Sequence, residues 1–367
     1  MKIESISIRN FKRFQNLEVS FKNVTLDEVS NRFLLLGDNG VGKTTLLQAI
    51  ALPLALATRQ IRNIPDFDWI GFVPGRFSRW GRPHIELEVS FSSEEIETTQ
   101  EVAWRWYQAQ SEDYQARYPF IEPSNSKLVS LILDGDSCRA GTREEFFQFR
   151  GRSNAQSLLK TDPSVRRLFD KLPGVFWFDQ FRNLGSSLHP NEAIGDVLQS
   201  NGRVSYDFGV ARLRRYLNGW KLAQQSRSEP YRIEYLRLLE NLYKKIFPGR
   251  SFAGVEPMPG IETPTAEDFY FLLNDGNYTY DIIEMSAGEQ AVFPILYEFV
   301  RLHIAHSVVL IDEIDLNLHP PVAQSLVSQL PKINPTCQFI LTTHSDAVTN
   351  IIGQDEIYRL QGGALCL

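Results

Sequence analysis

The sequence predicts an α/β fold with a central, mainly parallel sheet, an N-terminal antiparallel β-lobe and a helical insertion. Three observations predict it. A short apolar run over 33–36 leads through a glycine-rich turn into a helical pattern. A second apolar run, over 308–311, ends in two acids. Several early segments alternate apolar and polar side chains, as half-buried antiparallel strands do.

The glycine-rich turn has the pattern of a phosphate-binding P-loop. It matches Gly-x-x-x-x-Gly-Lys-[Ser/Thr] at every fixed position in the run Gly37-Asp38-Asn39-Gly40-Val41-Gly42-Lys43-Thr44. A strand, loop and helix in this order turn backbone N–H groups and a helix N-terminus toward a phosphate chain. Lys43 adds a positive charge for the β- and γ-phosphates, and the Thr44 hydroxyl is placed to hold Mg²⁺. The segment predicts a nucleoside triphosphate site, and we include the next helical residue, Thr45, in it.

The composition indicates a globular protein. The 367 residues are 43% hydrophobic and 22% charged, and the net charge of −6 provides no basic excess for nucleic acid. Cys138, Cys337 and Cys366 show no metal-ligand spacing, so we expect reduced thiols. The N-terminus has no apolar signal segment and no apolar run is long enough to span a bilayer. We therefore expect a cytoplasmic protein with no membrane partner.

The remaining elements follow from hydrophobic periodicity and turn residues. Strands are predicted over 2–8, 17–21, 85–91, 102–107, 128–133, 175–178, 269–273, 278–283, 338–342 and 357–360. Helices are predicted within 143–172, over 208–224, 231–247 and 288–303, and from 320 onward. Irregular structure is predicted over 53–81, 186–202 and 248–264. We divide the chain into an N-terminal lobe (1–180), a helical insert with a linker (181–265) and a C-terminal lobe (266–367).

Two further strand ends carry side chains that could complete the site. Asp312 and Glu313 follow the strand over 308–311, and His344 follows the strand over 338–342. Because the carboxyl ends of parallel strands meet at one edge of a sheet, these side chains are expected beside the P-loop. Asp312 would hold Mg²⁺, Glu313 would act as general base, and His344 would contact the γ-phosphate. The alternatives are an ordinary acidic strand boundary and a structural histidine.

A helix start provides a second possible anion site. Ser286 precedes a predicted helix and Glu289 stands three residues later, which is the spacing of a capping box. Capping alone could explain both residues. Alternatively, Ser286 and the amide of Gly288 form an anion site at the helix N-terminus.

Together these motifs resemble the ABC-type ATPase superfamily, and more narrowly its RecF/SMC/OLD-like branch. Walker A corresponds to 37–44, the signature to 285–290, Walker B to 308–313 and the His switch to His344. The opening Ile6-x-Ile8-Arg9-Asn10-Phe11-Lys12 is similar to the first hairpin of that branch, as Asp312 to Pro320 is to its extended Walker B. The resemblance is dense over 1–50 and 269–360, and thin between about 60 and 265.

The resemblance implies an ATPase that converts ATP and water to ADP and phosphate, with ATP and Mg²⁺ as cofactors. It implies a head-to-tail dimer or higher oligomer, in which Ser286 and Gly288 of one copy meet the γ-phosphate held by Lys43 of another. It also implies a glutamine that contacts nucleotide and metal after the β-lobe. Gln180 is our candidate, and an ordinary polar strand end is the alternative. The signature departs from the usual pattern at Met285, Ala287 and Glu289, which leaves the rate of hydrolysis open.

Two departures from SMC and OLD proteins limit the biological role that we expect for this chain. The insert has two helical patterns of about 17 residues, too short for a long SMC coiled coil. The chain continues only 23 residues past His344, so we expect no OLD nuclease domain. We therefore expect a stand-alone ATPase head in a nucleic-acid-linked process, either DNA repair or antiviral and plasmid defence, with a separate effector protein such as a nuclease. An ATP-dependent scaffold with little turnover, or a transporter motor subunit, is the alternative.

Possible DNA contacts come from two groups of basic residues. Arg76, Arg79 and Arg82 lie among Phe77 and Trp80, a mixture that suits phosphates and base stacking. The insert adds Arg212, Arg214, Arg215, Lys221, Arg227, Arg232, Arg237, Lys244 and Lys245. A solvated helix face or loop is the alternative for each group.

Overall fold

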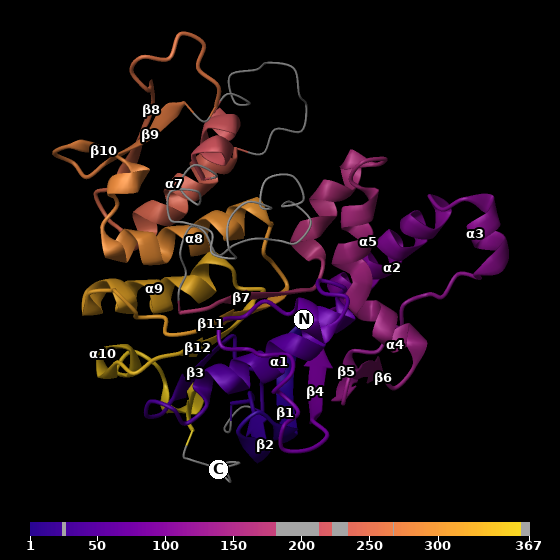
Figure 1. Ribbon diagram of the computed structural model, residues 1–367. Helices are drawn as coiled ribbons and strands as arrows, with labels where there is room; N and C mark the ends of the chain where they lie inside the picture. Colours follow the sequence, from indigo (N-terminus) through magenta and orange to yellow (C-terminus); the bar gives the residue numbers. More distant parts are fainter. Residues whose placement is uncertain (24–26, 181–212, 222–233, 267, 361–367) are drawn as a thin grey trace. The chain divides into compact units, whose positions relative to one another are not determined.

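The computed structural model describes residues 1–23, 27–180, 213–221, 234–266 and 268–360 (Figure 1). The chain forms two compact units. The first unit comprises Met1–Asp179, His303–Ile314 and Leu330–Leu367. The second unit comprises Gln180–Leu302 and Asp315–Gln329. The division of the chain into 1–180, 181–265 and 266–367, which we draw from the sequence, stays a prediction.

An antiparallel sheet forms the β-lobe of the first unit. Its strand order is β2-β1-β4-β5-β6, and its strands are β1 (Lys2–Phe11), β2 (Phe14–Ser20), β4 (His84–Ser90), β5 (Leu128–Asp134) and β6 (Ser137–Ala140). Alternate side chains such as Ile85, Leu87 and Val89 are fully buried, as a sheet with one face against a core requires. The predicted antiparallel β-lobe is confirmed.

A parallel sheet forms the centre of the first unit. Its strand order is β13-β3-β12-β11-β7, and its strands are β3 (Arg32–Leu36), β7 (Gly174–Phe178), β11 (Ser307–Ile311), β12 (Gln338–Thr342) and β13 (Ile357–Arg359). Every residue of β11 and β12 is buried, which explains their continuous apolar runs. Ile311 pairs with Leu341 of β12 and Phe178 of β7, so these three strands end together.

Helix α1 (Lys43–Ala57) follows the P-loop and packs against strands of both sheets (Figure 1). Most of its side chains are buried, which fits a helix that is apolar on all sides. Irregular structure was expected from Pro53 onward, and this is wrong for the first five residues because the helix continues through Pro53 to Ala57. A proline removes one backbone donor, and the packing on both faces keeps the helix intact.

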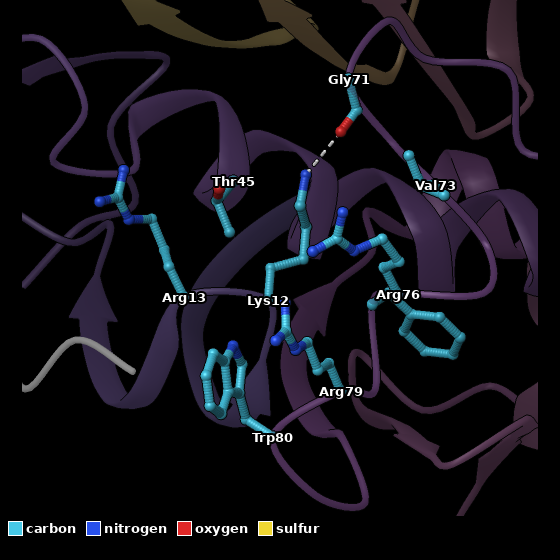
Figure 2. Close-up of a pocket in the computed structure, with 9 residues that line it drawn as sticks. Lys12, Arg13, Thr45, Gly71, Val73, Arg76, Arg79 and Trp80 are labelled. Carbon is cyan, nitrogen blue, oxygen red and sulfur yellow. Dashed lines mark hydrogen bonds between the residues drawn. The ribbon is translucent and has the colours of Figure 1, made fainter. Parts of the chain in front are cut away.

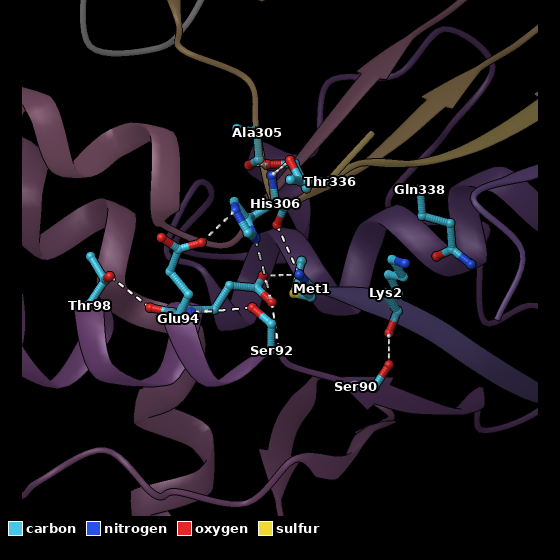
Figure 3. Close-up of polar contacts among 12 residues, drawn as sticks. Met1, Lys2, Ser90, Ser92, Glu94, Thr98, Ala305, His306, Thr336 and Gln338 are labelled. Carbon is cyan, nitrogen blue, oxygen red and sulfur yellow. Dashed lines mark hydrogen bonds and ion pairs between the residues drawn. The ribbon is translucent and has the colours of Figure 1, made fainter. Parts of the chain in front are cut away.

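The side chain of Gln338 links the two sheets. Its Oε1 accepts a hydrogen bond from the Ile3 N–H (2.7 Å) and its Nε2 donates to the Ile3 carbonyl (2.9 Å). Nearby, the backbone nitrogen of Met1 contacts the Glu95 carboxylate and donates to the carbonyl of His306 at 3.0 Å (Figure 3). The start of β1 is therefore tied to the residues before β11 and to β12, which holds the β-lobe on the parallel sheet.

The strand predicted over 102–107 is wrong, because these residues belong to helix α2 (Ser93–Gln108). Ser92 caps this helix and forms a capping box with Glu95, so the helix begins well before the apolar stretch. Ile96, Thr99, Val102 and Ala103 are buried on one helical face. Further helices of the first unit are α3 (Glu112–Arg117), α4 (Arg143–Phe147), α5 (Gly151–Leu158) and α10 (Asp346–Thr349).

The second unit contains a small antiparallel sheet of order β10-β9-β8. Its elements are β8 (Ser251–Pro257), β9 (Phe269–Asn274), β10 (Thr279–Asp281), α7 (Tyr235–Ile246) and α8 (Ala287–Arg301), with a helical segment over 213–221. Helix α9 (Pro320–Ile333) begins in this unit. The linker expected over 248–264 is wrong in part, because β8 pairs with β9 there.

Parts of the predicted insert lie outside the described residues, namely the connection over 186–202 and both ends of the helix over 208–224. Among the helices that the structure does describe, none has both the length and the apolar character needed to cross a membrane.

Candidate nucleotide site

The P-loop has a backbone that requires glycine. Gly42 occupies the N-cap of α1 with φ 110°, and a Cβ there would lie 2.6 Å from Cζ of Phe14. Gly37 has φ 154°, and a Cβ there would lie 2.9 Å from the Leu360 carbonyl oxygen. Side chains are therefore excluded by both conformation and space. Residues 38–40 are exposed, so the loop faces solvent in front of the helix N-terminus.

Lys43 lies under this loop and is 5% exposed. Its ammonium donates to the carbonyls of Gly37 (2.8 Å) and Asp38 (3.3 Å). The ammonium nitrogen also lies 2.7 Å from Nε2 of His344. The lysine and the histidine, which are 301 residues apart in sequence, thus meet at the carboxyl edge of the parallel sheet.

Asp312 is buried (1% exposed), and both of its carboxylate oxygens accept hydrogen bonds from threonine hydroxyls. Thr44 Oγ1 donates to Oδ2 at 2.7 Å, and Thr342 Oγ1 donates to Oδ1 at 2.6 Å. The Thr342 hydroxyl also accepts the backbone N–H of Glu313 at 2.7 Å. Thr342 therefore orients both acids, a role that the sequence did not reveal. The only available signal was a hydroxyl residue at the end of the strand before His344.

Glu313 has φ 49°, a left-handed conformation that is uncommon for a residue with a side chain. Its Oε1 lies 2.9 Å from Nε2 of His344, with exposures of 21% for Glu313 and 33% for His344. The turn after β11 thus directs the carboxylate to the open side of the site, beside the histidine. Strained backbone of this kind is concentrated at functional sites.

The donor set beside the P-loop fits Mg²⁺. The Thr44 hydroxyl and the Asp312 carboxylate are neighbouring oxygen ligands, the kind that Mg²⁺ prefers. Across the described ranges, no group of three or more histidine, cysteine or acidic residues could hold a metal alone. The ion would take its other ligands from phosphate oxygens and water, as Mg²⁺ commonly does. Gln180 is exposed two residues after β7, and its contact with metal and nucleotide stays a prediction.

In the second unit, Ser286 caps α8 and forms a complete capping box with Glu289. The capping interpretation is therefore confirmed, while the anion site at the same position stays a prediction. Ser286 and Ala287 are exposed. A Cβ on Gly288 would meet Asn317 and Leu318 at 3.5 and 3.6 Å, which is ordinary van der Waals contact, so packing within the chain does not require glycine there.

A pocket of about 390 Å³ opens beside the first turn of α1 (Figure 2). Its lining residues are Lys12, Arg13, Thr45, Gly71, Val73, Arg76, Phe77, Arg79 and Trp80. Four are cationic and none is acidic. Arg79 stacks on Trp80, which is 44% exposed. Burial, with a smaller contribution from neighbouring Arg13, lowers the pKa of Lys12 to about 8. The pocket therefore suits an anion that carries a flat ring.

The pocket contains most of the first predicted basic group. Arg76, Arg79, Phe77 and Trp80 line it. Arg82 does not, because its guanidinium pairs with Asp134 at the end of β5 at 2.8 Å. Lys12 and Arg13 were not predicted to belong to this group. They come from the β1–β2 turn, so only the fold brings them to the arginines.

The basic residues of the insert give less support to a nucleic-acid surface. Arg214 pairs with Asp281 and is largely buried. Arg237 pairs with Glu234, and Lys244 pairs with Glu240. Of the others, Arg215, Lys221 and Lys245 are described, whereas Arg212, Arg227 and Arg232 lie outside the described residues.

Comparison with known families decides the classification. Residues 159–350, more than half of the chain, match the family described as "AAA domain, putative AbiEii toxin, Type IV TA system". The chain belongs to this AAA-domain family. Residues 1–103, which include the P-loop, match a family described as "AAA ATPase domain". The two matches together contain the Walker A, signature, Walker B and switch segments, so this AAA-domain protein has the motifs of a nucleotide-binding P-loop ATPase.

Several known proteins resemble this AAA-domain chain. The "Retron Vc95 probable ATPase" of Vibrio cholerae serotype O1 biovar El Tor is 20% identical over 395 aligned residues, covering 97% of this chain and 73% of the relative. The "Retron Ec83 probable ATPase" of Escherichia coli is 31% identical over 103 residues, 25% of this chain and 19% of the relative. The Septu protein PtuA of Bacillus mycoides (strain KBAB4) is 26% identical, covering 94% of this chain and 38% of the relative.

Solved SMC heads are also similar. The Smc head bound to the C-winged helix domain of ScpA has a TM-score of 0.48 at 14% identity, covering 97% of this chain and 96% of that chain. The SMC head domain from Thermotoga maritima has a TM-score of 0.44 at 12% identity, covering 98% of this chain and 94% of that chain.

Proposed function

We propose that this protein hydrolyses ATP to ADP and phosphate, and that two copies pair head-to-tail around the nucleotide. The observation that carries the proposal is the bonded set at the carboxyl edge of the parallel sheet. In this set, the Asp312 carboxylate accepts a hydrogen bond from the Thr44 hydroxyl of the P-loop. The His344 imidazole lies between the Lys43 ammonium and the Glu313 carboxylate. A phosphate loop, a metal-type carboxylate and a candidate base thus lie at one edge of the sheet, the arrangement that phosphoryl transfer to water needs.

Each residue has a defined task in this proposal. Lys43 exchanges its carbonyl partners for the β- and γ-phosphates, which leaves His344 to contact the γ-phosphate. Glu313 orients the attacking water and takes its proton. Asp312 and Thr44 would hold Mg²⁺, which when bound neutralises charge on the phosphate oxygens. Thr342 keeps both acids in place through its hydroxyl.

Pairing of two copies is supported by the exposed start of α8. The first amides of a helix have no intrahelical partner, and a 15-residue helix adds the positive end of its dipole. Because Ser286 and Ala287 are exposed, a phosphate held by another copy could reach them. Packing within the chain does not require glycine at position 288. The absence of a side chain there would instead leave room for the phosphate of the other copy.

We further propose that ATP turnover is coupled to a nucleic-acid-linked process, with defence against phage or plasmids preferred over DNA repair. The names of the relatives, two retron ATPases and a Septu protein, support this choice. A separate effector protein such as a nuclease would act with the ATPase. The alternative is a scaffold with little turnover, in which the ATP-bound dimer recruits the effector.

The pocket beside α1 is the proposed contact for the flat part of a bound nucleotide or of a nucleic-acid strand. Thr45 both follows the phosphate loop and lines the pocket, so the base and sugar of ATP could extend into it. A matched pair of variants separates the two ligands, because Arg79 lines the pocket and Arg82 pairs elsewhere. Arg79→Ala should raise the KM for ATP if the nucleoside binds there. It should weaken salt-dependent DNA binding if a strand binds there. Arg82→Ala should change neither.

The central experiment measures ATP hydrolysis and assembly together. Glu313→Gln should abolish hydrolysis and accumulate an ATP-bound dimer, measured by light scattering after size exclusion. Glu97→Gln, at an exposed position of α2, is the matched control and should behave as the parent. If the parent hydrolyses no ATP, with or without double-stranded DNA, the proposed ATPase activity is wrong. If the parent hydrolyses ATP but Glu313→Gln forms no dimer with ATP, the proposed head-to-tail pairing is wrong.

A further inference from the structure

The capping glutamate of α8 lies in a buried polar network. Glu289 is 2% exposed. Its Oε2 accepts the N–H (3.0 Å) and the hydroxyl (2.7 Å) of Ser286. Its Oε1 accepts the hydroxyls of Tyr243 and Tyr280, the latter at 2.5 Å, and Arg250 Nη1 lies 3.3 Å away. An ordinary capping box needs only the bond to the N-cap N–H, so the other contacts require a separate explanation.

The donors come from separate elements of the second unit. Tyr243 belongs to α7 and is fully buried, and Tyr280 belongs to β10. Arg250 precedes β8 and donates to the Tyr280 hydroxyl at 2.6 Å. Burial alone would raise the pKa of the Glu289 carboxyl. The hydrogen bonds from Tyr243, Tyr280 and Ser286 outweigh burial and lower it. The carboxylate is therefore charged at neutral pH and depends on these donors.

The network also controls the hydroxyl of Ser286. That hydroxyl has one proton, which it donates to Glu289, and it accepts the Glu289 N–H at 3.4 Å. The first intrahelical bond of α8 runs from Gln290 to the carbonyl of Ser286, so the amides of Ala287 and Gly288 precede it. For Ser286 to donate to a phosphate, it must release Glu289. That release is inexpensive only if the carboxylate keeps its other donors.

We propose that Tyr243, Tyr280 and Arg250 are positioning residues for the anion site at the start of α8. They hold the charge of Glu289 while the Ser286 hydroxyl turns to the phosphate of a second copy, and they fix where the first amides of the helix lie. This inference rests on the proposed pairing of two copies. It gives α7 and the β9–β10 hairpin a part in hydrolysis that no sequence motif indicates.

Tyr280→Phe tests the inference, because it removes one hydroxyl and keeps the ring. Tyr278→Phe is the matched control, since Tyr278 belongs to the same hairpin and is 76% exposed. Tyr280→Phe should lower kcat about tenfold, the effect of losing one hydrogen bond to a charged group. The KM for ATP should stay close to that of the parent, and the melting temperature should fall by only a few degrees, which leaves the protein folded under assay conditions. Tyr278→Phe should match the parent in kcat, KM and melting temperature.

A second variant and a second measurement keep the test decisive. Arg250→Gln changes a partly exposed residue without emptying the core, and should lower kcat in the same direction. In the Glu313→Gln background, Tyr280→Phe should weaken ATP-dependent dimerisation to a similar extent, with nucleotide binding to the monomer retained.

Three results would overturn the inference. The first is an unchanged kcat for Tyr280→Phe. The second is a fall in nucleotide affinity or in melting temperature that is large enough to explain the lower kcat, because this would indicate a general effect on folding. The third is a dimer of the double variant as stable as that of Glu313→Gln alone. If Glu313→Gln itself forms no dimer with ATP, the proposed pairing is wrong, and the inference fails with it for a distinguishable reason.

Discussion

Replacing Thr342 with valine removes one hydroxyl from the site and keeps the branched shape of the side chain. The residue is fully buried at the end of β12. Its hydroxyl donates to Asp312 Oδ1 and accepts the N–H of Glu313. The valine leaves the carboxylate with one donor fewer and leaves that N–H without its acceptor.

The expected loss in the free energy of unfolding follows from these two hydrogen bonds. A hydrogen bond to a charged group contributes about 1.5–3 kcal/mol, and an unsatisfied buried donor costs about 1–3 kcal/mol. Since water can compensate in part, we expect a loss of about 3 kcal/mol in the free energy of unfolding. The effect on hydrolysis should be larger, because this bond helps to hold the left-handed turn that places the Glu313 carboxylate. A displacement of about 1 Å at the base costs roughly 100-fold in rate.

Urea unfolding and steady-state ATP hydrolysis measure the two effects separately. Thr58→Val is the control, because Thr58 is also buried and its hydroxyl donates only to carbonyls of α1 (Leu54 at 2.8 Å). It should cost about 1 kcal/mol and leave kcat unchanged. If Thr342→Val keeps the parental kcat, or destabilises no more than Thr58→Val, the proposed role of Thr342 in orienting the acids is wrong.

Three other predictions concern the loop, the signature and the pocket. Gly42→Ala should abolish ATP binding, because its Cβ would lie 2.6 Å from Phe14; calorimetric titration with ATP tests this, and normal affinity would contradict it. Gly288→Ala should fold normally, with unchanged or slightly higher stability in urea, yet lose ATP-dependent dimerisation; a normal dimer would show that nothing approaches Gly288. The pKa of Lys12 is lowered to about 8 by burial and by Arg13, so the folded protein loses this proton before the unfolded chain does. The pocket's affinity for ATP should therefore fall as pH rises from 7 to 9, whereas Lys12→Arg should remove that dependence.

The motifs of the nucleotide site were predictable because each follows a buried parallel strand. Such strands are continuous apolar runs, and their carboxyl ends meet at one edge. This pattern alone predicts that Lys43, Asp312, Glu313 and His344 lie together. Thr342 was not predictable, because a hydroxyl at a strand end has many possible partners, and only the register between β11 and β12 sets its bond to Asp312.

Each difference between the predicted and the observed elements has a specific physical cause. The apolar stretch over 102–107 resembles a strand, but the capping box at Ser92 starts a helix ten residues earlier. The segment over 251–257 contains glycine and proline, which is typical of a linker, but pairing with β9 makes it a strand. The sequence places Arg82 beside Arg76 and Arg79, whereas its guanidinium pairs with Asp134, 52 residues away. Pairing with a separate segment therefore decided the outcomes at 251–257 and at Arg82, whereas a local helix cap decided the outcome at 102–107.

The two helix starts, which the sequence presented as similar anion sites, differ in their chemistry. Gly42 caps α1 without a side chain, so no capping hydroxyl has to be released, although a phosphate there displaces bonds of Lys43 to loop carbonyls and to His344. Ser286 caps α8 with a hydroxyl that Glu289 already holds. A phosphate at α8 must therefore compete with a charged, buried acceptor, whereas one at α1 meets a loop whose residues 38–40 are exposed to solvent. Binding of ATP by a single copy should for this reason precede pairing, and the strength of the Glu289 network should set how readily pairing follows.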